Sequence, residues 1–524
     1  MLILSFKEGH DGTVAAIEDG RVLFSIEAEK DSWNRYTNLT GEAVVEAARL
    51  LPRAPDIVVL SGWIKGNQTS DQPSRTGYFG VGEESVSDEP SSYFGKEVRL
   101  FSSTHERSHI MTAYGLADSM GGRACYSLVW EGNIGSFYHV DEGGHITHLG
   151  ECVTFPGNKY SFLYALGDPG FHAQQEYMRF QDAGKLMALA AFGDDRGPRD
   201  DERILIDWIL DHPTVLTGAD TQALECAAFL DIGVESQQFK DLARQFSLAM
   251  FSRFHEWARA HLQRGLPLLI SGGCGLNCDW NRAWVESELF SEVFVPPCPN
   301  DSGSALGSAI DAQHYYTGSA QVEWNVYAGS EFVHDVAIDE QLFDVNPLDM
   351  DQVAGFIADG GIVGWARGRW EIGPRALGNR SILAAPFSEK TRDRLNAIKQ
   401  REGFRPIAPI CLEEDAHRWF DGPLPNPYML YFGRVLDENL LAVTHVDDSA
   451  RVQTVNPEQN SAMSELLVAF RARTGFSVLC NTSLNFSGRG FINRTSDLLE
   501  YGQSHGLDGY VIGDQFVRPR PSQF

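Results

Sequence analysis

One structural pattern occurs twice in the N-terminal part of the chain: an apolar strand, a glycine-containing loop and a hairpin. In the first copy, a strand at 2–6 precedes the loop that runs from Gly9 to Gly12, and Asp19-Gly20 is a strong hairpin-turn pair. The layout returns 123 residues later, where Glu131-Gly132 follows a strand and Glu142-Gly143 occupies the turn. This spacing predicts a duplicated unit. The alternative is two unrelated hairpins in a mixed protein.

A duplicated unit of this kind is typical of actin-like nucleotide-binding folds, in which the two glycine loops face each other and hold phosphates. The chain has 524 residues and exceeds the roughly 250–300 at which one core stops growing, so two or more domains are expected. A polar, acidic stretch without a long periodic run extends from Tyr315 to about Met350, and the domain boundary is placed near residue 345. We therefore predict an α/β and α+β protein with a duplicated actin-like domain over 1–345 and a smaller α/β domain over 346–524.

The chain is acidic, with 43 Lys and Arg against 71 Asp and Glu and a net charge of −28. Such a surface repels phosphate backbones and anionic lipids, so neither nucleic acid nor a membrane is an expected partner. No window approaches the ~20 apolar residues of a membrane span, and the N-terminus lacks a signal-peptide core. The eight Cys residues form no CxxC pair, which indicates a reduced, cytoplasmic protein.

Two further glycine loops follow predicted strands. A helix predicted over 235–264 precedes a buried strand at 266–270, which leads into Gly272-Gly273. Paired glycines after a strand let the backbone approach a ligand closely. The second loop contains Asp301, follows a strand at 293–295 and opens a helix of small residues at 304–312.

His105 and His109 have the i, i+4 spacing that places two imidazoles on one helix face, where they can bind one metal ion. Two exposed histidines on a helix are the alternative. A complete site needs a carboxylate from elsewhere, for which Asp301 is a good third ligand and Glu131 a fourth candidate. Two imidazoles with a carboxylate suit Fe(II), Zn or Mn.

Two further residues could act near such a site. His10 lies in the first glycine loop, where it could be the general base for an alcohol or could simply hydrogen-bond the loop. Lys185 lies at the start of an Ala-rich helix and could contact a phosphate or be solvated.

Lys and Arg residues are concentrated at several motifs of the C-terminal half, although the chain as a whole is acidic. They are flanked mostly by Gly, Pro and apolar residues, whereas a solvated face would interleave Glu with the Arg residues. Guanidinium forks beside backbone-rich turns are what a triphosphate or acyl phosphate requires, so an anion pocket is favoured over a solvated face. The residues of this predicted pocket are Arg375, Arg380, Lys399, Arg405, Arg451, Asn481 and Ser483.

A resemblance to a known family is carried by four C-terminal strings: GRWEIGPRALGNRSILAAP, KQREGFRPIAP, THVDDSARVQT and NTSLN. They closely resemble the nodulation-type O-carbamoyltransferase family. The N-terminal GHDG, the two histidines, GGCGLN and the DSG segment match in the family's order, so the resemblance covers nearly the whole chain. Within the family, FKEGHDG, FSSTHERSHI and DAGKLMALAAFG look most like the cephem carbamoyltransferases of antibiotic biosynthesis.

The resemblance implies a two-step enzyme with ATP, a divalent metal and carbamoyl phosphate. The C-terminal part is similar to a YrdC-like domain, which makes carbamoyl adenylate. Four residues match its substrate-binding positions, with Lys399 and Arg405 expected to be catalytic and Arg451 and Ser483 to bind. Three others lie nearby: Arg375, Arg380 and Asn481.

The N-terminal part is similar to the actin-like domain of threonylcarbamoyl-transfer enzymes, which passes the carbamoyl group to a hydroxyl of an alcohol acceptor. His10 matches the proposed base. His105, His109 and Asp301 match the metal ligands, with Fe(II) expected first and Zn, Mn or Mg as alternatives. Lys185 and the turn residues Gly272, Gly273 and Asn277 are expected at the nucleotide. A homodimer is compatible with the family.

Two departures from the family pattern affect these assignments. The family's Asp-Gly is Glu131-Gly132 here, so a longer carboxylate would have to reach the metal. The family's Gly-Glu-Gly-Lys is Asp182-Ala183-Gly184-Lys185 here, which changes the nearby contacts to the acceptor. Acceptor choice is expected in residues 63–95, predicted as a mobile surface loop or lid, and in 153–190. An actin-like kinase, a threonylcarbamoyl relative acting on tRNA and a non-enzymatic nucleotide-binding scaffold remain as alternatives, although the charge argues against tRNA.

Overall fold

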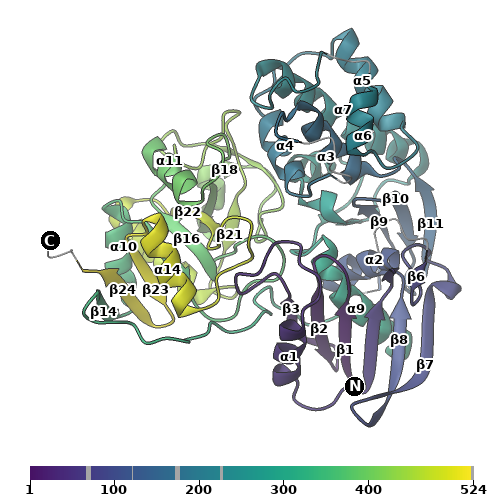
Figure 1. Ribbon diagram of the computed structural model, residues 1–524, viewed down its shortest axis with the longest axis horizontal. Helices are drawn as coiled ribbons and strands as arrows, with labels where there is room; N and C mark the ends of the chain where they lie inside the picture. Colours follow the sequence, from purple (N-terminus) through teal and green to yellow (C-terminus); the bar gives the residue numbers. More distant parts are fainter. Residues whose placement is uncertain (66–71, 121, 172–177, 225–227, 521–524) are drawn as a thin grey trace. The chain divides into compact units, whose positions relative to one another are not determined.

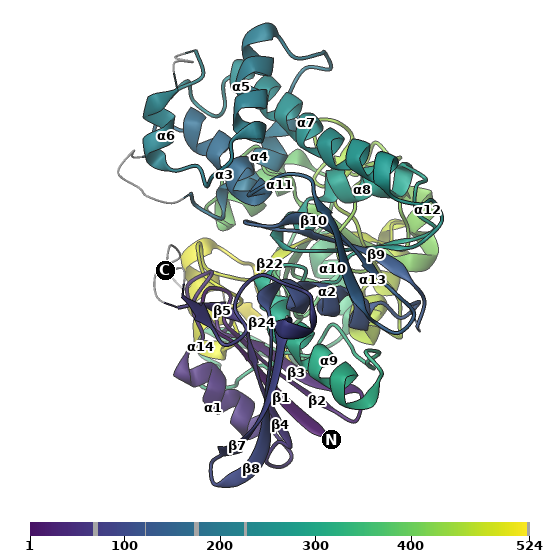
Figure 2. The same ribbon diagram turned by 90° about the vertical axis from the view of Figure 1, so that its right-hand side faces the viewer.

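The computed structural model describes residues 1–65, 72–120, 122–171, 178–224 and 228–520 (Figure 1, Figure 2). Contacts divide the chain into two compact units. The first unit contains Met1–Ser119, Pro296–Thr444 and Asp448–Phe524, and the second contains Met120–Val295 and His445–Asp447. The division into two domains near residue 345 stays a prediction. Within the described ranges, no helix has the length and apolar character that a membrane crossing requires.

The first unit begins with a six-stranded sheet of order β3-β2-β1-β4-β8-β7. Its central strand β1 is buried along its whole length, as its largely apolar sequence predicts for a strand covered on both faces. β1 pairs antiparallel with β2 and parallel with β4. The strands are β1 (Leu2–Lys7), β2 (Thr13–Glu18), β3 (Arg21–Glu27), β4 (Ile57–Ser61), β7 (Val86–Tyr93) and β8 (Lys96–Ser103).

Three helices accompany this sheet. α9 (Ser304–Thr317) packs against β1, β2 and β4, and α2 (His105–Leu116) packs against α9. α1 (Gly41–Leu50) lies beside β3 (Figure 1). The sheet therefore carries, through α9, the helix on which the two histidines lie.

The second unit repeats this arrangement in a sheet of order β11-β10-β9-β12-β13. β9 pairs antiparallel with β10 and parallel with β12, as β1 does with β2 and β4. The duplication predicted from the 123-residue spacing is therefore confirmed. The strands are β9 (Cys125–Trp130), β10 (Gly135–Val140), β11 (Ile146–Glu151), β12 (Leu268–Ser271) and β13 (Val293–Phe294).

The two hairpin turns differ. Asp19 and Gly20 both have positive φ, 47° and 85°, as a tight two-residue turn requires. In the second hairpin the residue with positive φ is Gly144, not Gly143, because Asp141 accepts from the amides of Gly143 and His145 and widens the turn.

The other helices of the second unit include the long one predicted over 235–264. It is α7 (Gln237–His261), and Ser236 caps it by accepting from the amide of Phe239. The remaining helices are α3 (Pro156–Gly167), α4 (Asp182–Ala190), α5 (Asp200–Asp211), α6 (Gly218–Ala223), α8 (Cys278–Glu286) and the 3-10 helix η2 (Gly273–Leu276).

The C-terminal part of the first unit is an eight-stranded mixed sheet of order β14-β24-β23-β15-β16-β22-β17-β21. Its strands are β14 (Phe343–Pro347), β15 (Val363–Ala366), β16 (Arg380–Ala384), β17 (Ala408–Leu412), β21 (Gln453–Val455), β22 (Val478–Ser483), β23 (Gly509–Ile512) and β24 (Gln515–Pro519). The mixed α/β class predicted for the chain is confirmed, and the YrdC-like assignment stays a prediction.

Helices cover both faces of this sheet. Trp365 packs in one hydrophobic cluster with α10 (Met350–Ala358) and α13 (Ser461–Thr474). Its neighbour Ala366 packs in another with α11 (Glu389–Ile398) and α14 (Thr495–His505). Adjacent strand residues point to opposite faces, so the sheet has a core on each side. The minor elements are β5 (Trp63–Ile64), β6 (Pro73–Ser74), β18 (Phe420–Asp421), β19 (Gly433–Val435), β20 (Ser449–Ala450), α12 (Ala416–Trp419), η1 (Glu83–Ser85), η3 (Asp301–Gly303) and η4 (Glu413–Asp415).

The prediction of a surface loop over residues 63–95 is partly wrong. Residues 86–93 form β7, which pairs with β8 along its whole length as the edge strand of the first sheet. Its sequence VSDEPSSY has little apolar character because an edge strand with an exposed face needs few apolar residues. Residues 66–71 of the same segment lie outside the described ranges.

Candidate active site

His105 and His109 lie one turn apart at the start of α2, where Thr104 caps the helix by accepting from the amide of Arg107. Asp301 begins η3, just before α9. The Nε2 atoms of the two histidines are 3.1 Å apart, and Asp301 Oδ1 lies 3.5 Å from that of His105 and 3.4 Å from that of His109. All three residues are buried. We call them the metal cluster.

The spacing of these atoms fits a divalent ion. Two ligands at roughly 2.1 Å from one ion in tetrahedral geometry lie about 3.4 Å apart. The described ranges contain no other group of three His, Cys, Asp or Glu side chains that meets this proximity. The metal cluster therefore has the donor set and size for a transition metal.

Small residues bring the metal cluster together. A Cβ at Gly307 of α9 would lie 1.9 Å from the main-chain oxygen of Ser108 of α2, and one at Gly303 would lie 2.2 Å from that of Cys298. Only glycine allows the two helices to approach this closely. The helix of small residues predicted from the sequence is thus what places Asp301 beside the histidines.

The charges of the metal cluster are strongly perturbed. Burial lowers the pKa of His105 to about 3, although the Asp301 carboxylate opposes that shift. Burial alone would raise the pKa of Asp301, but electrostatic interactions with His105, Lys7 and His10 hold it well below its ordinary range. Neutral imidazoles and an ionised carboxylate are the forms that bind a metal ion.

Three residues around the metal cluster were missed by the sequence analysis. Lys7 lies 3.2 Å from Asp301 Oδ2, Trp63 contacts the rings of His10 and His105, and Tyr78 lies 4.4 Å from the His105 ring centroid. A lysine at the end of an apolar strand was the available signal for Lys7, whereas nothing in the sequence marks the two aromatic residues.

His10, the predicted base, lies beside this cluster. Its Nδ1 is 3.0 Å from Asp11 Oδ2, and its Nε2 is 3.6 Å from Asp301 Oδ2. The imidazole is therefore held between two carboxylates at the edge of the metal cluster.

The predicted nucleotide turn and Glu131 lie in the second unit. Gly272 has a φ of 94°, and a Cβ there would meet the main-chain oxygen of Trp130 at 2.3 Å. Asn277 caps α8 by accepting from two main-chain amides, and its side-chain nitrogen is buried without a hydrogen-bond partner. The Glu131 side chain accepts from the amide of Ile134 at 3.0 Å. Its ligand role stays a prediction.

Lys185, also in the second unit, lies in α4. Its Nζ is 3.4 Å from Asp182 Oδ1 and 5.4 Å from the centroid of the Tyr164 ring. The side chain is mostly buried, so it is not the solvated lysine of the alternative interpretation.

The C-terminal cations form a second centre in the first unit. Burial lowers the pKa of Arg401 to about 9, and the charges of Arg405 and Arg451 contribute to the shift. Burial and the charges of Arg401, Arg405 and Arg35 hold the pKa of Lys399 well below its ordinary range. These mutual repulsions indicate that the five side chains, which we call the cation cluster, lie near one another and favour an anion.

Arg35 joins this cluster from the other end of the chain. Its segment runs beside residues 488–490: the Arg35 amide donates to Gly488 O, and the Gly490 amide donates to Trp33 O. Its guanidinium lies 2.9 Å from Glu29 Oε2. The sequence analysis missed Arg35 because no local motif surrounds it.

Lys399 Nζ donates to the main-chain oxygens of Ser483 and Asn485 and to Asn485 Oδ1. Asn485 in turn donates to Arg489 O, next to the segment that carries Arg35. Asn485 therefore links Lys399, the predicted catalytic lysine, to residues 488–490, which pair with the N-terminal segment that carries Arg35.

Other predicted pocket residues have structural roles. Arg380 is fully buried, and its guanidinium donates to Asn493 Oδ1 and to the main-chain oxygens of Arg367, Gly368 and Asn379. These bonds use all five N–H groups, so the structure does not support the predicted ligand contact of Arg380. Asn481 donates to Ala376 O and Gln453 Oε1.

Arg375 follows a turn at Gly373 that is held from both sides. The Gly373 amide donates to Glu27 Oε1, and its carbonyl accepts from Lys30 Nζ. A Cβ at Gly373 would meet Pro297 O at 2.1 Å, close in sequence to Asp301. The buried pair Glu27 and Lys30 therefore fixes the turn that carries Arg375.

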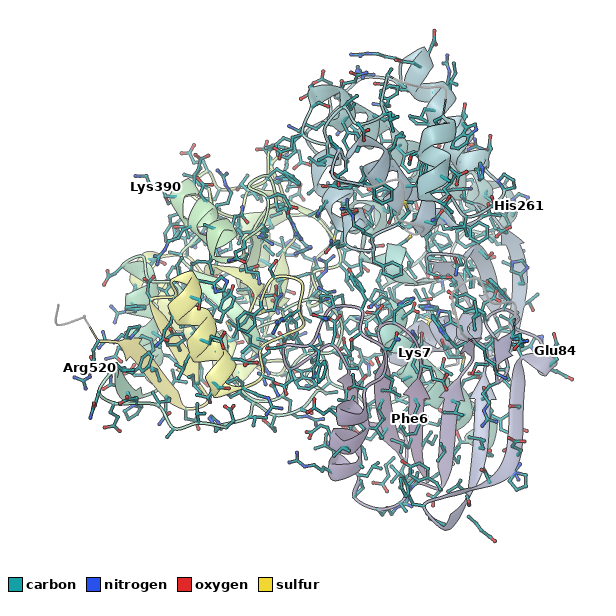
Figure 3. The ribbon with its side chains drawn as sticks, in the orientation of Figure 1. Phe6, Lys7, Glu84, His261, Lys390 and Arg520 are labelled. Atoms are coloured by element: carbon teal, nitrogen blue, oxygen red, sulfur yellow. The ribbon has the colours of Figure 1, made fainter. Side chains whose placement is uncertain are left out.

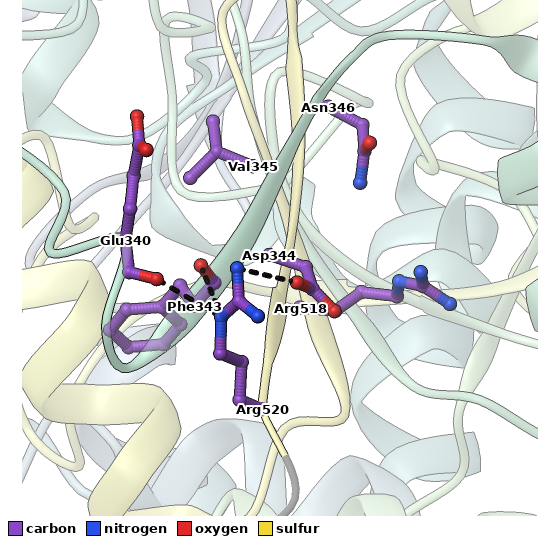
Figure 4. A pocket seen from close by; sticks show the side chains of 7 residues that line it. All are labelled: Glu340, Phe343, Asp344, Val345, Asn346, Arg518 and Arg520. Carbon is purple, nitrogen blue, oxygen red and sulfur yellow. Dashed lines mark hydrogen bonds and ion pairs between the residues drawn. The ribbon is translucent and has the colours of Figure 1, made fainter.

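A surface hollow of about 410 Å³ is lined by residues of the paired strands β14 and β24 and by residues next to them (Figure 4). Arg520 spans it, with ion pairing to Asp344 and hydrogen bonds to the main-chain oxygens of Glu340 and Phe343. None of its lining residues is a predicted site residue, and Arg520 is already paired.

Family models match two parts of the chain: "Carbamoyltransferase C-terminus" over residues 354–519 and "Carbamoyltransferase N-terminus" over residues 235–310. The chain is 49% identical to a 3'-hydroxymethylcephem-O-carbamoyltransferase of Amycolatopsis lactamdurans and 47% identical to one of Streptomyces clavuligerus, with 99% of both chains covered in each case. It is 34% identical to nodulation protein U of Rhizobium tropici, over 96% of this chain and 94% of that one.

Similar solved structures include full-length HypF in the phosphate- and nucleotide-bound form, with 13% identity, a TM-score of 0.34 and coverage of 61% of this chain and 56% of that one. TM-scores this low do not establish a shared fold.

Proposed function

The chain belongs to the carbamoyltransferase family and is a carbamoyltransferase, and on that premise we propose that it carbamoylates the 3'-hydroxymethyl group of a cephem in antibiotic biosynthesis. The observation that carries the proposal is the identity of 49% and 47%, over 99% of the chain, to two enzymes of that name. This identity spans the segments 63–95 and 153–190, in which acceptor choice is expected.

Carbamoyl phosphate and ATP are the co-substrates. Both are anions that repel each other, and the cation cluster supplies the positive charge that offsets this repulsion. Water converts carbamoyl phosphate into carbamate and phosphate. A carbamate oxygen then attacks the α-phosphorus of ATP, pyrophosphate leaves and carbamoyl adenylate forms.

The metal cluster would hold a divalent ion, Fe(II) first and Zn, Mn or Mg as alternatives. Such an ion, when bound, would polarise the carbamoyl oxygen or hold the adenylate phosphate. The acceptor's oxygen forms a bond to the carbamoyl carbon, and the bond between that carbon and the AMP oxygen breaks. His10 takes the hydroxyl proton, and the carboxylates of Asp11 and Asp301 on either side of its ring stabilise the imidazolium.

Pyrophosphate release tests the first step. Metal-reconstituted protein should release pyrophosphate from ATP only when carbamoyl phosphate is present, and it should do so without any acceptor. Formation of ADP instead of pyrophosphate would refute the adenylate step and would revive the kinase alternative, which family membership otherwise disfavours.

Two variants separate the steps. Arg405→Ala should abolish adenylate formation, because it removes a charge of the cation cluster. His10→Ala should spare adenylate formation but slow transfer by about 10²–10⁴-fold, the usual contribution of a general base. Arg434→Ala is a matched control, since its side chain is 61% exposed and pairs with Asp421. Equal loss of both steps in His10→Ala would contradict the base role.

The acceptor is tested by mass spectrometry of the products. A 3'-hydroxymethyl cephem should gain one carbamoyl group, whereas a cephem with a 3-methyl group should not react. If neither compound reacts while the adenylate forms, the acceptor proposal fails and the adenylate step stands.

A further inference from the structure

Lys7 is the last residue of β1 (Figure 3). Its side chain is fully buried. Its Nζ lies 3.2 Å from Asp301 Oδ2 and donates to the main-chain oxygen of His10. The same ammonium lies 3.9 Å from the centroid of the Trp63 ring. Lysine is rarely fully buried unless it is paired with an opposite charge. The burial of Lys7 therefore points to its interaction with Asp301.

The two oxygens of Asp301 have different neighbours. Oδ1 faces His105 and His109, at 3.5 and 3.4 Å. Oδ2 faces Lys7 at 3.2 Å and His10 at 3.6 Å. A carboxylate held at one oxygen by an ammonium presents the other oxygen to an ion in a defined direction.

We propose that Lys7 is a positioning residue of the metal cluster: its ammonium holds Asp301 by Oδ2, keeps Oδ1 directed at the histidines and balances the carboxylate charge while no ion is bound. The inference rests on the metal-binding role proposed above. Lys7 also opposes the ion electrostatically, because both are cations in a buried place. The loaded cluster then carries more positive than negative charge, which suits an anionic carbamoyl donor.

The test is the affinity of the full chain for Co²⁺, measured by chelator competition and visible absorption. Lys7→Met keeps the length of the side chain and its contact with Trp63 but removes the charge. We expect Co²⁺ to bind at least about tenfold more tightly, because the opposing charge is gone. The absorption should weaken, as Asp301 becomes able to bind through both oxygens and the coordination number rises.

Lys96→Met is the matched control. Lys96, the first residue of β8, also pairs with a carboxylate, and its Nζ lies 3.1 Å from Asp56 Oδ1. It is not part of the metal cluster, so its loss should leave Co²⁺ affinity within about twofold of the wild type.

Unchanged or weaker Co²⁺ binding by folded Lys7→Met would overturn the role of Lys7, provided that the wild type binds. Failure of the wild type to bind Co²⁺ would overturn the metal-binding role itself and this inference with it. If Lys7→Met does not fold, Lys7→Gln is measured in the same way, with the same expected increase in affinity.

Discussion

Gly307→Ala should separate the two helices that form the metal cluster. The added Cβ would lie 1.9 Å from Ser108 O, whereas real Cβ contacts are essentially never shorter than 3.0 Å. α2 and α9 must therefore move apart by about 1.1 Å, from 1.9 Å to at least 3.0 Å. Overpacking of this kind costs about 1–3 kcal/mol, partly offset by the ~0.5–1 kcal/mol that Gly→Ala contributes in a helix.

The same movement should weaken metal binding, because metal–ligand distances tolerate only about ±0.2 Å. We expect a loss of about tenfold to a hundredfold in Co²⁺ affinity, the range seen when the surroundings of a metal site are disturbed. Chelator competition measures the affinity, and a thermal melt measures stability.

Gly184→Ala is the matched control for this experiment. Gly184 also lies in a helix, α4, but a Cβ there would meet nothing within 4 Å. It should raise the melting temperature slightly and leave Co²⁺ affinity unchanged. If Gly307→Ala behaved like Gly184→Ala in both measurements, the close helix crossing would not be what positions Asp301.

Three further perturbations address other parts of the first unit. Arg35→Gln should raise the KM for carbamoyl phosphate in pyrophosphate release several-fold and leave transfer from preformed adenylate unchanged; an unchanged KM would remove Arg35 from the cation cluster. Burial raises the pKa of Glu27 from 4.5 to about 7, so its contribution to stability is full below pH 4.5 and is lost as pH rises through 7. Glu27→Gln should therefore flatten the fall of the melting temperature between pH 5 and 8, and an unaltered slope would contradict this. Arg380→Met leaves Asn493 Oδ1 and three main-chain carbonyls without their donor. It should lower the free energy of unfolding by about 3–5 kcal/mol, which thermal unfolding measures. A variant that melts like the wild type but loses ATP binding would instead support a ligand role for Arg380.

Elements with strong local signals were predicted correctly from the sequence. The helix predicted over 235–264 was found at 237–261 because its apolar residues recur at helical spacing and Ser236 caps it. β7 was missed because an edge strand shares its ladder with β8 and needs no apolar alternation of its own. Its ordering depends on a partner strand, which local propensity does not describe.

The candidate site likewise contains some features that local sequence determines and others that depend on tertiary contacts. The sequence by itself determined that His105 and His109 share a helix face, since four residues make about one helical turn, and that the first strand and hairpin recur 123 residues later. The tertiary structure alone decided that Lys7 lies against Asp301 and that Arg35 joins cations about 365–415 residues further along the chain.

It also decided between arginines that look alike in sequence. Arg380 gives all its hydrogen bonds to the protein, whereas Arg401 and Arg405 repel one another beside Lys399. The physical reason is that hydrogen-bond saturation and charge repulsion depend on which atoms surround a side chain. Those neighbours come from segments far apart in sequence and meet only when the sheets and helices pack.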